Sequence, residues 1–298
     1  MSSTRVVTDT DNRYSWQQKT KHYTDDGVLI RRETIYDNGR ETETLFTEAG
    51  VISEKTDLDL ADAKSWTAKH LRFDETGTIA WLSKSWDNGR TLEQTFDNGR
   101  IASKALVDGG DEYSWTTKTE TFDANGKMAT QEIHYDDGRI LEAAWTNGRI
   151  SSEAWQDTGD VEVWVSKLSL HDSKGKISSL EVLYDDGRLL EAAYDAGKLV
   201  QKDWTDTGDA FAWAEKSEGY GADGGLDWRV VTSDDGVIHE TAFADGVITG
   251  EVRYDTDDAH DWDSQHVDYD GNGNRASLTI VYDDLHQEVY SYIEMAWV

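Results

Sequence analysis

Residues 115–163 read WTTKTETFDANGKMATQEIHYDDGRILEAAWTNGRISSEAWQDTGDVEV, and their pattern specifies the architecture of the chain. It contains four turn signals, at residues 123–126, 136–138, 146–148 and 157–160. Runs of about seven to eleven residues separate them, which is the usual length of a β-strand. Asn-Gly and Asp-Gly between such runs indicate hairpins, because glycine takes a positive φ without steric cost. Asp-Asp-Gly matches a type I turn followed by a glycine bulge. The stretch therefore predicts four antiparallel strands.

The side chains in this stretch alternate with the period of a strand. After Gly138, one face carries Arg139, Leu141, Ala143 and Trp145, and the other carries Ile140, Glu142 and Ala144. Glycine interrupts every run, so long helices are not expected.

The same pattern occurs six times. A tryptophan marks each copy, with spacings of 50, 49, 49, 49 and 49 residues, at Trp16, Trp66, Trp115, Trp164, Trp213 and Trp262. Self-similarity at a fixed spacing indicates a repeat architecture. We expect an all-β fold in which residues 1–298 form a single repeat array. Each ~49-residue repeat would be a four-stranded antiparallel meander, with residues 1–15 as an N-terminal cap and 287–298 as a C-terminal edge strand.

Two arrangements of these strands are compatible with the repeat. Six units of four strands are the count of a six-bladed β-propeller. A propeller must cross from the outer strand of one blade to the inner strand of the next, about 14 Å at ~4.8 Å per strand. Here the link is a tight Asp-Thr-Gly-Asp turn, at 157–160 and again at 206–209. This favours one elongated or coiled β-sheet array, with the propeller as the alternative.

A family resemblance rests on the turns. Phe122-Asp-Ala-Asn-Gly-Lys, Tyr135-Asp-Asp-Gly-Arg, Tyr184-Asp-Asp-Gly-Arg and Tyr269-Asp-Gly-Asn-Gly-Asn-Arg resemble the signature of Rhs/YD-repeat proteins, and more loosely that of MORN-type repeats. The resemblance implies a β-sheet ribbon and says more about architecture than about activity.

The charge and hydrophobicity of the chain limit the kinds of partner that it can have. The formal net charge is −31 and there is no cysteine or proline. Nucleic-acid binding needs basic patches, so it is not expected. No window reaches 18 apolar residues, so membrane insertion is not expected either. The first residues lack the apolar core of a Sec signal peptide. An extracellular or virion-associated location is favoured, and a cytoplasmic one stays open.

Three columns of charged residues follow the repeat. Lysines lie three residues after the marker tryptophan, glutamates lie 27 residues after it, and arginines follow the second turn: Lys19, Lys69, Lys118, Lys167, Lys216; Glu43, Glu93, Glu142, Glu191, Glu240; Arg40, Arg90, Arg139, Arg188. We expect them to be cross-strand partners or solubilising charges. We also expect turn aromatics such as Tyr135 to stack on the arginine across the hairpin, here Arg139.

Oxygen ligands are densest between residues 254 and 274. Calcium is a candidate ligand there, with the candidate metal residues Asp255, Asp257, Asp258, Asp268, Asp270 and Asn272. The competing interpretation is that both acidic groups are ordinary turns of the repeat. No other cofactor is expected.

No nucleophile elbow, phosphate loop or zinc motif is present, so we expect a protein that is not an enzyme. The sequence predicts a structural or adhesive β-repeat scaffold of an extracellular, phage or secreted assembly. Its partners would be other protein subunits or itself, through a terminal edge that includes Tyr292, Ile293, Met295, Trp297 and Val298. The alternatives are a carbohydrate-binding module with glycan partners on its aromatic rows, and a propeller that binds a ligand.

Overall fold

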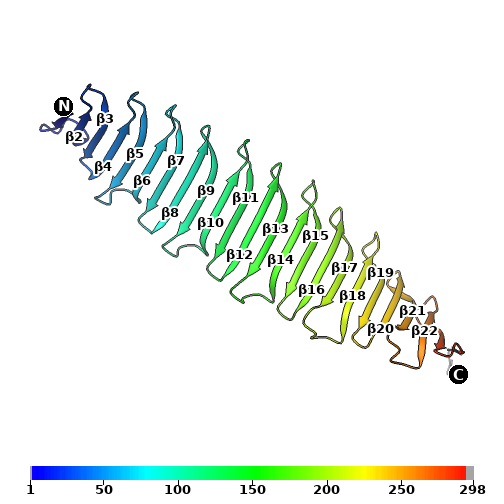
Figure 1. Cartoon of the computed structure of the whole chain (residues 1–298). Helices are drawn as coiled ribbons and strands as arrows, with labels where there is room; N and C mark the ends of the chain where they lie inside the picture. The colour runs from blue at the N-terminus through cyan, green and yellow to red at the C-terminus, as the bar shows by residue number, and fades with distance from the viewer. Residues whose placement is uncertain (1, 293–298) are drawn as a thin grey trace. The chain divides into compact units, whose positions relative to one another are not determined.

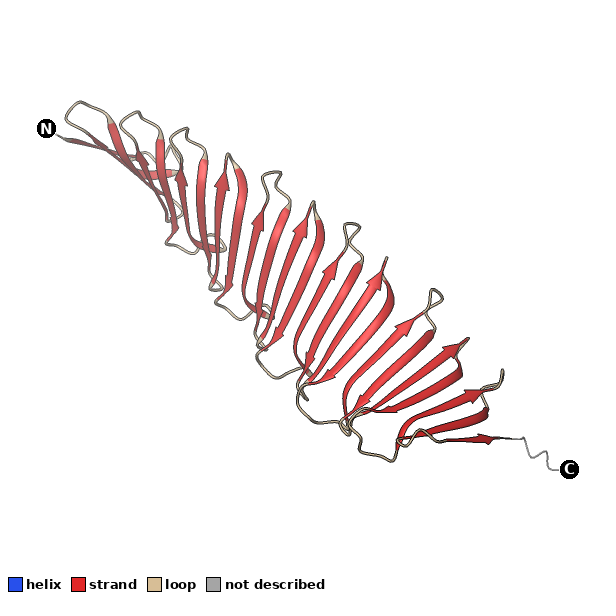
Figure 2. Cartoon of the chain, turned by 45° about the vertical axis from the view of Figure 1, so that its right-hand side comes forward, coloured by secondary structure: helices blue, strands red, loops and turns tan. Residues whose placement is uncertain are grey.

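The computed structural model describes residues 2–292, and every regular element in this range is a β-strand (Figure 2). No helix able to span a membrane occurs in the described part of the chain. The chain divides into two compact units, Met1–Gly148 and Arg149–Val298, and each is considered by itself.

The first unit contains twelve strands (Figure 1): β1 (Ser3–Thr8), β2 (Trp16–Tyr23), β3 (Leu29–Tyr36), β4 (Arg40–Phe46), β5 (Ile52–Asp59), β6 (Trp66–Phe73), β7 (Ile79–Trp86), β8 (Arg90–Asp97), β9 (Arg100–Asp108), β10 (Trp115–Phe122), β11 (Met128–Tyr135) and β12 (Arg139–Thr146).

The second unit contains the other twelve: β13 (Arg149–Asp157), β14 (Trp164–His171), β15 (Ile177–Tyr184), β16 (Arg188–Asp195), β17 (Lys198–Asp206), β18 (Trp213–Tyr220), β19 (Leu226–Ser233), β20 (Val237–Ala244), β21 (Val247–Asp255), β22 (Trp262–Tyr269), β23 (Arg275–Tyr282) and β24 (Gln287–Ser291).

Within each unit every strand pairs antiparallel with the next one in sequence. The strands on either side of an inter-repeat link also pair, as in β5 with β6 and β17 with β18. A propeller would leave that link as an unpaired crossing between blades, so the propeller alternative is wrong. The all-β meander is confirmed, because in the described residues of each unit the strands pair with their neighbours in sequence.

Each repeat begins at its marker tryptophan and contributes strands in a fixed order. In the fourth repeat the first, second, third and fourth strands are β14, β15, β16 and β17. The segment expected as an N-terminal cap contains a strand of its own, β1, which pairs with β2 over six residues. By position it is a fourth strand that precedes the first tryptophan.

Two turn types set the hairpins. Between the second and third strands of the first five repeats only the glycine has a positive φ, as at Gly187 (+84°), whose N–H donates to the Tyr184 carbonyl at 3.0 Å, and in the sixth repeat Leu285 (69°) takes this position. The form with glycine is the predicted type I turn with a glycine bulge. Between the third and fourth strands of the second to fifth repeats two residues have positive φ, as at Asn98 (49°) and Gly99 (76°), whereas the first repeat has only Gly50 (79°) there. The geometry with two positive φ values is a type I′ turn, whose twist matches that of the strands.

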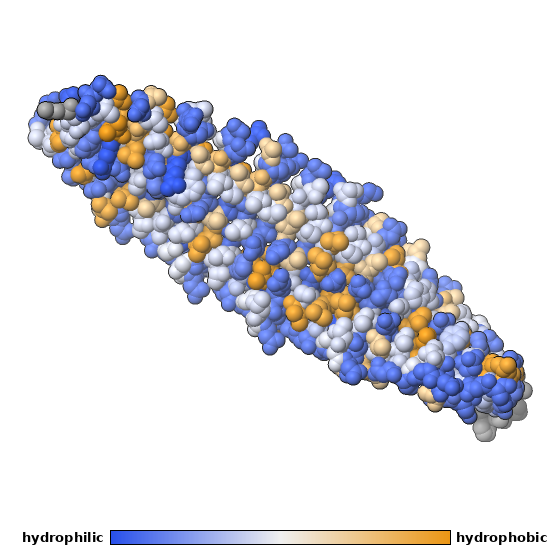
Figure 3. Space-filling view, in the orientation of Figure 1, coloured by the Kyte–Doolittle hydropathy of each residue, from blue (hydrophilic) through white to orange (hydrophobic). Residues whose placement is uncertain are grey.

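One face of the sheet carries the packed side chains. In the second unit Trp164, Val182 and Leu190 are buried, and they pack with Trp155, Leu180, Tyr184 and Trp204. Glu191, which follows Leu190, is exposed on the opposite face. The predicted alternation is therefore confirmed. Apolar groups are interrupted by polar ones on the visible surface (Figure 3), as expected for a sheet with one thin side-chain layer.

Candidate functional site

The turns between second and third strands lie beside the loops that lead from a fourth strand to the next first strand. We call each such pair a junction. In the fourth repeat the junction joins the turn 184–188 to the loop 206–212. The Thr207 N–H donates to the Gly187 carbonyl at 2.9 Å, and the Thr207 hydroxyl donates to the same oxygen. The backbone thus fixes how turn and loop lie together.

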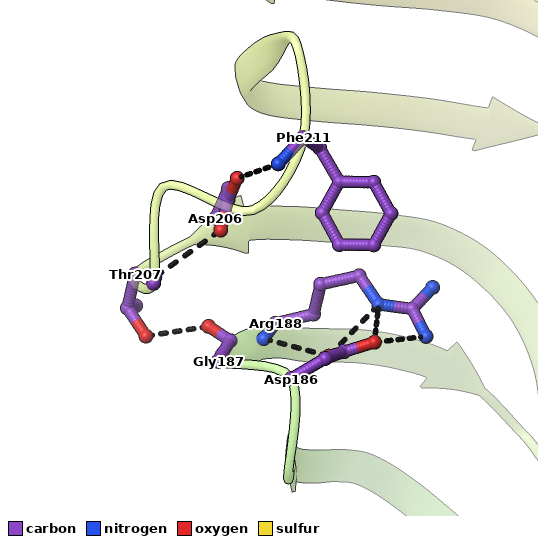
Figure 4. Close-up of polar contacts among 7 residues, drawn as sticks. Asp186, Gly187, Arg188, Asp206, Thr207 and Phe211 are labelled. Atoms are coloured by element: carbon purple, nitrogen blue, oxygen red, sulfur yellow. Dashed lines mark hydrogen bonds and ion pairs between the residues drawn. The ribbon is translucent and has the colours of Figure 1, made fainter.

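Arg188 is the centre of this junction (Figure 4). Its guanidinium carbon lies 5.1 Å from the Tyr184 ring centroid, 5.5 Å from that of Trp204 and 5.0 Å from that of Phe211. Its Nε donates to Asp186 Oδ2 at 2.9 Å. The predicted stacking of turn aromatic on arginine is confirmed, and the loop adds a third ring to it.

The loop is held by the last residue of the fourth strand. The two carboxylate oxygens of Asp206 accept N–H groups of the loop, Oδ1 from Gly208 at 3.1 Å and Oδ2 from Phe211 at 2.7 Å. Phe211 in turn stacks on the marker Trp213, with centroids 5.3 Å apart. Asp206 therefore sets the position from which Phe211 reaches Arg188.

The same junction recurs with variations. In the first unit Arg90 lies 4.2 Å from the Trp86 ring and donates to the Tyr113 hydroxyl at 2.7 Å. The fifth repeat has Val237 at the arginine position. The sixth has His286, whose ring stacks on Tyr282 at 4.1 Å. The arginine column is thus a stacking position that the last two repeats fill differently.

The pKa values of the two adjacent aspartates in the Asp-Asp-Gly turn are shifted in opposite directions. Loss of hydration, and then the carboxylates of Asp160 and Asp157 in the preceding loop, raise the pKa of Asp185. Hydrogen bonds from the side chain and backbone of Arg188 lower the pKa of Asp186. The pKa of Asp136 is raised in the same way in the first unit, by desolvation and then Asp111 and Asp108. At these two turns the acidic residues of the preceding loop concentrate like charge around the first aspartate of the turn.

The lysine column stacks on the marker tryptophans. Lys19 lies 4.2 Å from the Trp16 ring centroid, Lys69 lies 4.3 Å from Trp66, and Lys167 lies 4.7 Å from Trp164. The glutamate column lies on the opposite face, where Glu33 and Glu43 face each other across β3 and β4 and share Arg31. These contacts agree with the structural role that we predicted for the lysine and glutamate columns.

Sequence reasoning missed one buried ionic centre. Glu120 is only 6% exposed and pairs with Lys118 at 2.9 Å and Lys104 at 3.1 Å. Burial alone would raise the pKa of Glu120, but hydrogen bonds from both lysines outweigh it and the pKa is lowered. The available signal was an acid two residues after a column lysine, with a second lysine on the preceding strand. Glu218 repeats it with Lys216 at 2.9 Å.

The candidate calcium residues fall into two groups. Asp255, Asp257 and Asp258 lie at and after the end of β21, whereas Asp270 and Asn272 lie in the turn after β22. Strand β22 separates the two, a span of about 25 Å at ~3.3 Å per residue. Asp270 caps its own turn by accepting the N–H groups of Asn272 and Asn274, both at 2.9 Å.

Two further placements bear on the calcium prediction. Asp268 accepts a hydrogen bond from Ser277 at 2.6 Å. Across residues 2–292 no group of three or more histidine, aspartate or glutamate side chains is arranged to hold a metal ion. The calcium site stays a prediction, and its six residues are not gathered in one place.

Of the expected interaction edge, one residue is described. Tyr292 is 46% exposed, and its N–H donates to the Ala276 carbonyl at 2.9 Å. Ile293, Met295, Trp297 and Val298 lie outside the described residues.

Comparison with known proteins gives weak likenesses. No family model and no curated protein matches the chain. A TcdB2-TccC3-TEV structure is 17% identical with a TM-score of 0.22, over 88% of this chain and 15% of that one. A 6-phosphogluconolactonase structure from Bacteroides uniformis ATCC 8492 is 14% identical with a TM-score of 0.16, over 98% and 92% of the two chains. The chain thus spans about 15% of the length of the first structure. Neither likeness bears on function.

Proposed function

We propose that this chain is a non-enzymatic β-repeat scaffold that acts through protein–protein contacts in a larger assembly. The observation that carries the proposal is the junction. Its charged and aromatic side chains, with Arg188 as the example, are engaged with one another. The stack of arginine on turn aromatic recurs in the first four repeats, which is how a structural array is built.

The opposite face supplies the contact surface. It presents a regular column of glutamates, in which Glu181 faces Glu191 across β15 and β16, and Asp203 faces Glu191 from β17. Regularly spaced carboxylates favour a basic protein partner, because complementary charge steers association and selects the partner. The Rhs/YD resemblance of the turns fits this proposal, since it implies a sheet that encloses or supports other protein parts.

The test is the integrity of the native assembly. A tagged chain is isolated after mild cross-linking, in the wild type and in a variant with Glu191→Lys and Glu240→Lys. We expect the variant to lose its stoichiometric partner while its circular dichroism is unchanged. Lys174→Glu, in an exposed turn, is the matched control and should keep the partner. An assembly unaffected by charge reversal, or turnover of a substrate by the purified chain, would contradict the proposal.

A second candidate function is glycan binding, favoured by one feature. Trp228 is 39% exposed and lies over Gly219, where an added Cβ would be 2.1 Å from the indole nitrogen. Its other strand neighbour is Ala242. The equivalent Trp81 is covered by Arg72, 4.9 Å away. A flat indole between small residues is a platform for a sugar ring.

Glycan-array binding distinguishes this candidate. Binding that is lost in Trp228→Ala and kept in Trp81→Ala would support it. Equal signals from both variants and from the wild type would count against a sugar site at Trp228.

A further inference from the structure

The first strand of the described chain has the identity of a fourth strand. Thr8 pairs with Gln18, two residues after Trp16, just as Thr205 pairs with Glu215, two residues after Trp213. The loop that follows is also the same. Asp9 accepts the Tyr14 N–H at 2.7 Å, as Asp206 accepts that of Phe211 at 2.7 Å. In a complete repeat the fourth strand pairs with a third strand on one side and with the next first strand on the other. Strand β1 pairs with the first strand β2, so its outward edge is the one that would pair with a third strand.

The last described strand has the identity of a third strand. In β24, Glu288 pairs with Ile280, which corresponds to Leu190 with Val182 in the fourth repeat. No bulge interrupts the register of β23 with β24 or of β1 with β2. Strand β24 therefore has the edge that faces a fourth strand in a complete repeat.

The register between third and fourth strands is known from inside the molecule. In β16 and β17, Glu191 pairs with Asp203 and Ala192 with Lys202. Transferred to the two ends, this register would place five pairs opposite each other: Gln287 with Thr8, Glu288 with Val7, Val289 with Val6, Tyr290 with Arg5, and Ser291 with Thr4.

The backbone directions agree with this register. The Asp9 N–H donates inward to the Gln17 carbonyl, and the Tyr292 N–H donates inward to the Ala276 carbonyl, both at 2.9 Å. Antiparallel pairs alternate between hydrogen-bonded and non-hydrogen-bonded positions. The residues whose amides point outward are therefore Thr4, Val6 and Thr8 on β1, and Gln287, Val289 and Ser291 on β24. These are the residues that the transferred register brings together as hydrogen-bonded pairs.

Two of the five pairs are complementary, whereas Glu288 would face the apolar Val7. Val6 is 54% exposed and Val289 is 66% exposed, and the register would bury each against the other. Arg5 would lie across from Tyr290, a cation beside a ring. Free edges in soluble proteins are commonly blocked by lysine, proline or a bulge. Strands β1 and β24 have none of these, although each carries one charged side chain, Arg5 and Glu288.

We propose that two copies of this chain join end to end, with β1 of one copy extending the sheet of the other beyond β24. The inference rests on the proposed scaffold function and names its partner as a second copy. The contact is head-to-tail, so a pair of copies still presents the outward edge of β1 from one copy and that of β24 from the other, and addition can continue. The net charge of −31 opposes it, and salt should promote it by screening.

The test is sedimentation velocity of the full chain over a range of concentrations in about 1 M NaCl, where the screening length is ~3 Å. We expect the mean mass to grow past a dimer. Val6→Lys and Val289→Glu should each weaken association about tenfold, because each sets a charge against a valine. In the double variant a lysine faces a glutamate at every contact between copies, so association should be restored. Val163→Lys, at a 72% exposed loop residue, is the matched control.

A second variant guards against misfolding. Val6→Pro removes an amide that no strand of the same chain uses, so the thermal transition should stay while association is lost. Three results would overturn the inference: a monomer at all concentrations, a mass that stops at a dimer and responds to Val6→Lys alone, or single variants that associate like the wild type. A monomer that still holds its native partners would leave the scaffold function standing.

Discussion

The guanidinium of Arg188 lies 5.0 Å from the ring centroid of Phe211, although one residue belongs to a hairpin turn and the other to an inter-repeat loop. The contact joins two elements that the chain visits more than twenty residues apart. We expect the pair to couple the turn to the loop. Arg188→Ala and Phe211→Ala should each lower stability, and the double variant should lose less than the sum.

A coupling of about 0.5–2 kcal/mol is expected for a partly desolvated cation over a ring. Urea unfolding of the four proteins of the cycle measures it. Lys174→Ala, in an exposed turn, is the control for loss of a cation. Additive effects of the two substitutions would show that the contact is only proximity.

The glycines of the inter-repeat loops predict a steric effect. An added Cβ at Gly110 would lie 1.8 Å from the Asn88 carbonyl oxygen, a backbone atom in the neighbouring turn. Gly110→Ala should therefore cost about 1–3 kcal/mol and lower the midpoint of thermal unfolding. At Gly271 nothing lies within 4 Å of the added atom, so Gly271→Ala is the matched control and should be near neutral. Equal midpoints for both variants would contradict the close approach of turn and loop.

The two aspartates of one turn predict opposite responses. The pKa of Asp185 is raised, so its ionised form destabilises the fold and stability is gained as the pH falls through that pKa. Asp185→Asn should therefore raise the melting temperature at pH 7. The pKa of Asp186 is lowered, so its stabilisation is present at neutral pH and lost in acid. Asp186→Asn should lower the melting temperature at pH 7.

Calorimetric scans between about pH 3 and pH 7 give both differences. The Asp185→Asn difference should shrink as the pH falls from the raised pKa of Asp185 to the ordinary aspartate value of about 3.9, whereas the Asp186→Asn difference should shrink only below that value. Added NaCl should shrink the Asp185→Asn difference at pH 7, because it screens the surrounding carboxylates. Changes of the same sign in both variants would contradict the electrostatic assignment.

The buried Glu120 predicts a pH-dependent loss of stability. Because its pKa is lowered, its contribution is present above the ordinary pKa of a glutamate and is lost as the pH falls through the lowered one. Glu120→Gln should cost about 1–3 kcal/mol at pH 7, since it leaves Lys118 and Lys104 without their shared carboxylate. Urea unfolding at pH 7 and at about pH 3 measures it, with the exposed Glu75→Gln as control. A loss of the same size at both values would point to packing instead of charge.

Much of the architecture could be predicted because the signals are local. Asp136-Asp137-Gly138 specifies its turn through the positive φ of one glycine. In a strand, side chains alternate between the two faces of the sheet with a period of two, so the face of each residue can be predicted. Trp115 and its counterparts fix the length of the repeat. The stacking of Tyr135 with Arg139 was predictable too, because a hairpin with a three-residue loop brings these two flanking residues together.

The candidate sites could be predicted only in part. Asp258 and Asp270 are close in sequence, yet the whole length of β22 lies between them, so they are at opposite ends of that strand. A segment rich in aspartate therefore does not form one site when an extended strand runs through it. Glu120 was missed for the converse reason, since Lys104 is distant in sequence and adjacent in the sheet.

The strands, their turns and the period of the array follow from local sequence, because each depends on side-chain alternation and on backbone angles within a few residues. Which turn lies against which loop depends on the folded chain, which places Phe211 on Arg188 and the carboxyl of Asp185 near that of Asp160. The folded chain also gives β1 the edge of a fourth strand and β24 that of a third. These relationships depend on the register between strands, which fixes distances among residues that are far apart along the chain.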